Sequence, residues 1–101
     1  MAHKVLLTWN IQSGIEREHF QRIRVFVSKL SGLGLDLADA WYTAYGDAPQ
    51  VLLGIVAAGG QEDQLQNILD SEEWGEVLTE LKPYITDYRQ RIVKKEGQFQ
   101  F

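Results

Sequence analysis

Cysteine is absent from the 101-residue chain, and proline and methionine are scarce, with two and one residues. The absence of cysteine excludes disulfides, thiol catalysis and thiolate metal sites. His3 and His19 lie far apart in the sequence and have no matched acidic trio, so we expect no metal site. Packing alone must therefore hold the fold together.

A long hydrophobic run and an excess of positive charge are also missing. The N-terminal segment MAHKVLLTWNI is too short, and too soon interrupted by Thr8 and Asn10, for a signal peptide or a membrane span. The formal net charge of −4 provides no global electrostatic footprint for nucleic acid or anionic lipid. We therefore expect a soluble, cytoplasmic protein with neither nucleic-acid nor membrane partners.

The composition is that of an ordinary globular protein, with 45% hydrophobic and 24% charged residues. A chain of this length predicts one domain, spanning residues 1–101. Such a small domain buries a smaller fraction of its surface than a larger one would, which makes self-association an expected remedy.

The first predicted element is a strand over residues 3–12, because apolar residues alternate there. The alternation puts Val5, Leu7, Trp9 and Ile11 on one face and Leu6, Thr8, Asn10 and Gln12 on the other. Ser13 and Glu16 then match the S-x-x-E capping box, which predicts the start of a helix.

The first predicted helix has an apolar stripe at helical spacing and ends at the segment SGLGL, where Gly32 and Gly34 allow a left-handed turn. The stripe consists of Phe20, Ile23, Phe26, Val27 and Leu30. Next, LADAWYTAY (37–45) and QVLLGIVAA (50–58) flank a GDAP turn and predict a hairpin of two antiparallel strands.

Between residues 61 and 82 the helical pattern changes phase, which predicts two helical pieces with a break near Asp70 and Ser71. Ser71 is positioned to cap the second piece, and Pro83 ends it. The segment ITDYRQRIVKK (85–95) then predicts a final strand. Its alternation assigns Thr86, Tyr88, Gln90 and Ile92 to one face and Asp87, Arg89, Arg91 and Val93 to the other.

The predicted order is strand, helix, strand, strand, helix, strand. This order is typical of the ferredoxin-like α+β fold, in which both helices cover one face of a four-stranded antiparallel sheet. The strands carry apolar residues on both faces, among them Leu6, Leu52, Val56 and Ile92. We therefore expect a homodimer in which two sheets meet to form a barrel.

With this element order, the sequence resembles the dimeric α+β-barrel superfamily, which includes antibiotic-biosynthesis-type monooxygenases, stress-responsive barrel proteins, haem-degrading monooxygenases and NIPSNAP-like proteins. The resemblance covers nearly the whole chain and is most specific at SEEWGEVLTELKPYITDYRQRIV (71–93). It implies the dimeric barrel architecture more strongly than any one activity.

The resemblance implies two kinds of site. In the cofactor-free oxygenases of the superfamily, an asparagine holds an enolate oxygen, a tryptophan stacks and an arginine holds the developing anion; the matching residues here are Asn10, Trp74 and either Arg89 or Arg91. In the haem-degrading members a histidine follows the tryptophan by about ten residues, and Tyr84 stands at that position here.

Other residues have a functional and a structural interpretation. His19 is the best general base in the chain, or a half-buried histidine at a helix–sheet edge. Trp74 belongs to the site or anchors the second helix. The aromatic residues either bind substrate or pack in a dimer interface; they are Trp41, Tyr42, Tyr84 and Tyr88.

A basic cluster marks the last strand and either attracts an anion or keeps a sheet edge soluble. It comprises Arg89, Arg91, Lys94 and Lys95.

The sequence thus favours a homodimeric α+β-barrel protein with a monooxygenase-like activity that needs no cofactor. Its substrate would be a small aromatic or apolar molecule in a cavity between sheet and helices. The alternatives are a non-catalytic dimer that binds a small ligand or acts in stress, and a haem-binding protein.

Overall fold

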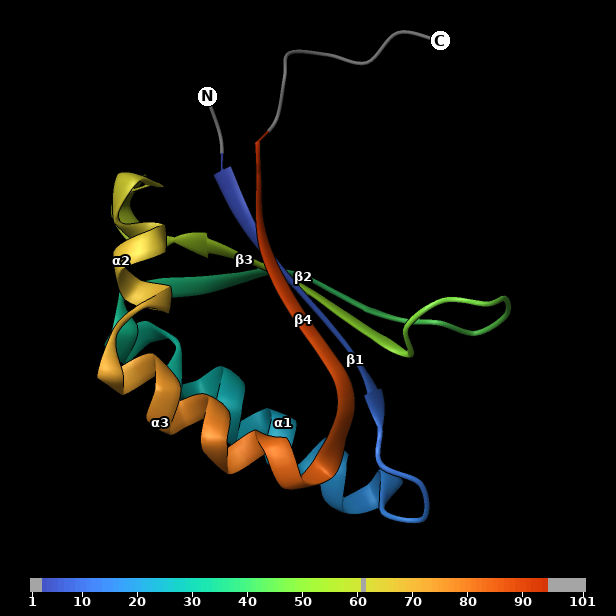
Figure 1. Ribbon diagram of the computed structural model, residues 1–101. Coiled ribbons are helices and arrows are strands. Elements are labelled where there is room, and N and C mark those ends of the chain that lie inside the picture. The colour runs from blue at the N-terminus through green and yellow to red at the C-terminus, as the bar shows by residue number, and fades with distance from the viewer. Residues whose placement is uncertain (1–2, 61, 95–101) are drawn as a thin grey trace, which may run out of the picture.

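The computed structural model describes residues 3–60 and 62–94, so Lys95 and the tail after it lie outside the described residues. All six predicted elements are present in the predicted order (Figure 1). The strands are β1 (His3–Ile11), β2 (Leu35–Tyr42), β3 (Val51–Ala57) and β4 (Ile85–Lys94), and the α-helices are α1 (Glu16–Lys29), α2 (Leu65–Leu69) and α3 (Glu72–Leu81).

The four strands form one antiparallel sheet in the order β2-β3-β1-β4. Helices α1 and α3 lie side by side on one face of this sheet, and no helix in the described ranges covers the other (Figure 1). The ferredoxin-like α+β prediction is confirmed.

We call the side of the sheet that no described helix covers the outer face. Cross-strand pairing places on it Leu6, Thr8, Asp39, Trp41, Leu52, Val56, Arg89 and Arg91.

The alternation predicted for β1 is seen in its burial, because every second residue from Val5 to Ile11 is buried. Trp9 lies at the centre of the layer between sheet and helices, where its ring meets Phe26 of α1 at 6.3 Å. Phe26 in turn meets Trp74 of α3 at 5.8 Å. A chain of aromatic rings therefore joins the central strand to both helices.

The capping box predicted at the start of α1 does not form. The N-cap is Ile15, and no side chain caps the helix. Glu16 does reach back, with its Oε1 accepting a long hydrogen bond of 3.4 Å from the Gly14 N–H. Ser13 lies too early because Gly14, at φ 86°, turns the chain before the first helical residue. At the other end of α1, Gly34 closes the turn at φ 79°.

The break predicted near Asp70 and Ser71 is confirmed, since α2 ends at Leu69 and α3 begins at Glu72. The Ser71 Oγ accepts a hydrogen bond of 3.2 Å from the Trp74 N–H and donates one of 2.6 Å to the Ile68 carbonyl. Ser71 thus caps α3 and links it to the end of α2.

Two bulges alter the predicted strand faces. In β2, the register shift between Leu37 and Asp39 leaves Ala38 without a partner, and the strand spans 35–42 rather than the predicted 37–45. In β4, Asp87 has a φ of 53°. Two residues of β4, Asp87 and Tyr88, stand opposite the single residue Trp9 of β1. The prediction that Thr86 and Tyr88 share a face is therefore wrong, because an extra residue reverses the alternation.

No helix in the described part of the chain is long and apolar enough to cross a membrane.

The capping role of Ser71 generates a stability prediction. Ser71→Ala removes the acceptor for the Trp74 N–H and should lower the free energy of unfolding by about 1 kcal/mol. Ser13→Ala is the matched control and should leave stability nearly unchanged, because Ser13 caps nothing. Urea unfolding followed by tryptophan fluorescence measures both; equal losses in the two variants would contradict this assignment.

Candidate functional site

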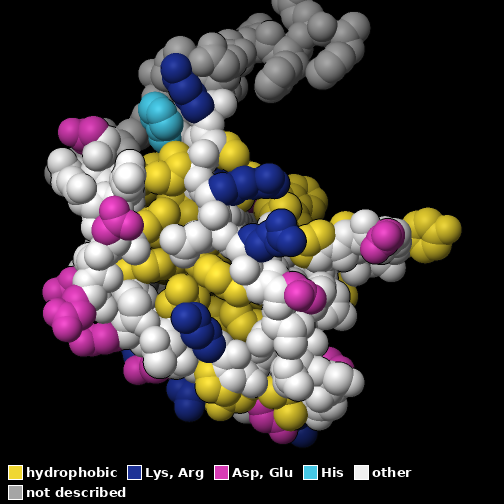
Figure 2. Space-filling view, viewed as in Figure 1, with side chains coloured by type: hydrophobic (Ala, Val, Ile, Leu, Met, Phe, Trp, Pro, Cys, Tyr) yellow, Lys and Arg dark blue, Asp and Glu magenta, His cyan; other side chains and the backbone are white. Residues whose placement is uncertain are grey.

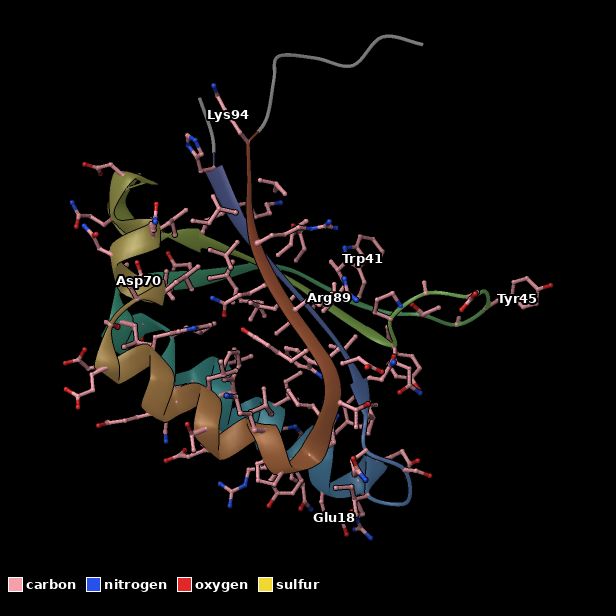
Figure 3. All side chains as sticks on the ribbon, in the orientation of Figure 1. Glu18, Trp41, Tyr45, Asp70, Arg89 and Lys94 are labelled. Atoms are coloured by element: carbon pink, nitrogen blue, oxygen red, sulfur yellow. The ribbon has the colours of Figure 1, made fainter. Side chains whose placement is uncertain are left out.

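The sheet separates the residues that the sequence suggested as one site. Asn10 pairs with Thr86 and points to the outer face, as does Arg89 opposite Thr8. Trp74 comes from α3, on the opposite side. Figure 3 shows Arg89 and Trp41 on the same side of the sheet, away from the helices. The structure therefore does not bring Asn10 and Trp74 together.

Asn10 holds three strands in place. Its Oδ1 accepts a hydrogen bond of 3.0 Å from the Gln50 N–H, and its Nδ2 donates one of 3.1 Å to the Asp87 carboxylate. Gln50 returns the contact, because its Oε1 accepts from the Ile11 N–H at 2.6 Å. Both ends of the Asn10 amide are thus engaged where β1 meets the start of β3 and the bulge of β4.

Trp74 and Tyr88 converge on one side chain in the layer between sheet and helices. The Gln90 Oε1 accepts hydrogen bonds from the Trp74 Nε1–H at 3.3 Å and from the Tyr88 hydroxyl at 2.7 Å. The Tyr88 ring stacks on Trp9 at 6.2 Å, and burial raises the pKa of Tyr88 above its ordinary value. This geometry fits the anchoring interpretation of Trp74.

His19 is completely buried, with 0% of its surface exposed, rather than half-buried as expected. Its Nε2 accepts a hydrogen bond of 2.9 Å from the Trp9 Nε1–H. The proton of the neutral imidazole therefore lies on Nδ1, which has no partner in the described part of the chain. Burial lowers the pKa of His19 below 6.5, which favours this neutral form.

The residues present do not fit a haem. Tyr84 stands at the expected ligand position, but its ring packs under the Arg22 guanidinium at 5.7 Å. The space next to Trp74 is filled by Phe26 and Tyr88. Among the described residues, no group of three or more His, Cys, Asp or Glu side chains is arranged to hold a metal ion.

A pocket of about 250 Å³ opens between α1 and the edge of the sheet, and we call it the edge pocket. Two aromatic rings on this side of the sheet stay accessible: Phe20 is 42% exposed and Tyr42 54%. Trp41 borders the pocket, but cross-strand pairing puts its side chain on the outer face. Phe20 and Tyr42 meet at 5.9 Å, and Ala40 contributes only a methyl group between them and β3. The lining residues are Phe20, Ile23, Ala40, Trp41, Tyr42, Val51 and Leu53.

A larger groove, of about 750 Å³, lies on the outer face, and we call it the arginine groove. Figure 2 shows basic side chains over β4 next to hydrophobic ones. The lining residues are Leu6, Thr8, Pro49, Leu52, Arg89, Gln90 and Arg91. Asn10, Trp74 and His19 line neither this groove nor the edge pocket.

From the sequence, Phe20 was expected in the apolar stripe of the first helix, and Ala40 was not among the predicted site residues. Phe20 lies at one margin of the apolar stripe of α1, and that position was the available signal that its ring is only partly covered. The small size of Ala40 next to aromatic residues was the second signal. Trp41 and Tyr42, by contrast, were suggested as binding residues. Both border the edge pocket, but the Trp41 side chain lies on the outer face.

The buried His19 predicts a pH dependence of stability. Its pKa is lowered in the folded state, so the unfolded chain binds more protons as the pH falls below about 7, and the free energy of unfolding decreases. His19→Gln keeps an acceptor for Trp9 but cannot ionise. Between about pH 7 and pH 5 the wild type should lose stability relative to this variant in urea unfolding; parallel pH profiles would contradict the assignment.

No protein-family model matches the chain, and no curated protein matches it in sequence. Solved structures do resemble it. A NIPSNAP family protein from Agrobacterium tumefaciens is 13% identical, with 96% of this chain and 95% of that chain covered and a TM-score of 0.67. A dimeric ferredoxin-like protein of unknown function from Thermobifida fusca is 12% identical, with coverages of 92% and 90% and a TM-score of 0.65.

An antibiotic biosynthesis monooxygenase is 12% identical, with 94% of this chain and 99% of that chain covered and a TM-score of 0.60. Identities this low establish the fold alone. The resemblance inferred from the sequence is confirmed at that level: the chain has the ferredoxin-like α+β fold of these NIPSNAP, ferredoxin-like and monooxygenase structures.

Proposed function

We propose that the chain forms a homodimer through its outer face and that each copy binds a small aromatic or apolar molecule in the edge pocket. The observation that carries the binding function is the pair of accessible aromatic rings, Phe20 and Tyr42, next to the small side chain of Ala40. Aromatic rings give a ligand large contact area at low conformational cost. No charged side chain lines the edge pocket, which favours a neutral ligand.

The dimer is supported by the composition of the outer face. Leu6, Leu52 and Val56 form an apolar band across its two central strands, and each is only partly buried. Trp41 extends this band onto β2. An exposed apolar sheet face is typical of an interaction surface, and a second sheet packed about 10 Å away would cover it. One structure with this fold is described as dimeric.

A cofactor-independent, monooxygenase-like activity is the second candidate function. One observation favours it: the His19 Nδ1–H is a buried donor without an acceptor in the described part of the chain, and the His19 ring contacts Phe20 of the edge pocket at 4.8 Å. One structurally similar protein is an antibiotic biosynthesis monooxygenase. In this chain the activity would depend on His19 and the edge pocket, because Asn10, Trp74 and Arg89 do not converge.

Filling the edge pocket tests the binding function. Ala40→Leu places a larger side chain among the aromatic rings and should weaken binding of the neutral probe 1-naphthol about tenfold or more. Nitrogen–proton correlation spectra during titration report the affinity and the amides that shift. Ala44→Leu, in the exposed loop after β2, is the control and should bind as the wild type does. Equal affinity for all three proteins would refute a ligand at this position.

The dimer is tested by adding a charge to the outer face. The wild type should have twice the 11.6 kDa mass of one chain in light scattering and native mass spectrometry. Val56→Lys should give a monomer, because a buried ammonium without a partner opposes association. Val25→Lys, on the exposed side of α1, should remain a dimer. A monomeric wild type, or a dimeric Val56→Lys variant, would argue against the outer-face interface.

A further inference from the structure

We propose that the arginine groove binds an organic anion, namely a carboxylate attached to an apolar body. This is a second site, on the opposite side of the sheet from the pocket between α1 and β2, and its ligand is chemically different. The groove is lined by residues of one copy of the chain, and in the proposed dimer it would lie between the two sheets. It does not require the edge pocket to be occupied.

The positive wall of the groove consists of two neighbouring guanidinium groups. Arg89 and Arg91 are alternate residues of the edge strand β4, so they share a face and their Cα atoms lie about 7 Å apart. Within residues 3–60 and 62–94, neither arginine has an ion pair or a side-chain hydrogen bond. Two like charges held next to each other repel, and an anion between them removes that repulsion.

The carboxylates on the outer face either have another partner or lie far from the groove. Asp39 forms an ion pair with Lys4, and Asp87 accepts the hydrogen bond from Asn10. Asp36 stands on β2, at the opposite edge of the sheet. The net charge of the chain is negative, so a shortage of acidic residues does not explain the unpaired arginines.

The rest of the groove defines the ligand class. Leu6, Leu52 and Pro49 supply an apolar surface. Thr8 of β1, which pairs with Leu52 on one side and Arg89 on the other, contributes a hydroxyl. A guanidinium group presents two parallel donors that match the two oxygens of a carboxylate. An inorganic anion would leave the apolar surface wet, whereas an acyl or aryl carboxylate covers it.

A second copy of the chain offers a competing counter-charge. In the proposed dimer the outer faces meet, so a carboxylate of the partner subunit would compete with an added anion for β4. In that case the two arginines would stabilise the dimer directly, and the wild type would have no affinity for an added carboxylate. The experiment must therefore record both ligand affinity and subunit mass.

Isothermal titration of the full chain with octanoate tests the proposal. Arg89→Gln/Arg91→Gln should weaken octanoate binding about tenfold or more, because the charge-assisted hydrogen bonds are lost. The matched control is Arg17→Gln/Arg24→Gln, which removes the same charge from the exposed side of α1 and should bind normally. 1-Octanol has the apolar body but no carboxylate, and inorganic phosphate has the charge but no apolar body. Both should bind far more weakly than octanoate.

Three outcomes would overturn the proposal: no octanoate binding to the wild type, unchanged affinity in the Arg89→Gln/Arg91→Gln variant, and equal affinity for 1-octanol or phosphate. If the wild type ignores octanoate while the double variant becomes a monomer, the counter-charge is the partner's carboxylate. Ala40→Leu should leave octanoate affinity intact, so failure at the edge pocket is distinguishable from failure here.

Discussion

The contact between Trp9 and His19 determines how the interior of this protein is used. Trp9 stands on β1, the strand to which β3 and β4 both pair, and its indole N–H has one acceptor, the His19 Nε2. Burying that N–H without a partner would cost about 1–3 kcal/mol. Helix α1 must therefore pack on the sheet in the position that places His19 next to Trp9. The stacking of Trp9 with Tyr88 and its contact with Phe26 then follow from one fixed ring.

Trp9, Phe26 and Trp74 are buried and in contact at the centre of the layer between sheet and helices. This differs from the arrangement implied by the resemblance, in which the asparagine of the first strand and the tryptophan of the second helix serve one site. Here Asn10 and Trp74 are both engaged in hydrogen bonds that position strands and helices. Space for a ligand is left at the margin of the layer and on the outer face.

The sequence predicted the order of elements, the apolar face of β1 and the break before α3, because each depends on local periodicity or on one capping residue such as Ser71. It did not predict the bulge at Asp87, where a positive φ adds a residue that no alternation pattern reveals. The candidate site depended on such faces. Which side chains meet at the edge pocket is set by tertiary packing, so the sequence suggested Tyr42 as a binding residue but not its neighbour Phe20.

Both proposed sites involve edge strands, and there is a physical reason for this. The central strand β3 is buried along most of its length, whereas β2, beyond the cover of α1, is exposed at all but two of its positions between Leu35 and Tyr42. A side chain on β3 contributes to stability, and changing it leaves a cavity. A side chain on β2 or β4 is free of that constraint, so aromatic rings and unpaired guanidinium groups can accumulate there. The sheet thus separates the edge pocket, which opens toward α1, from the arginine groove on the outer face.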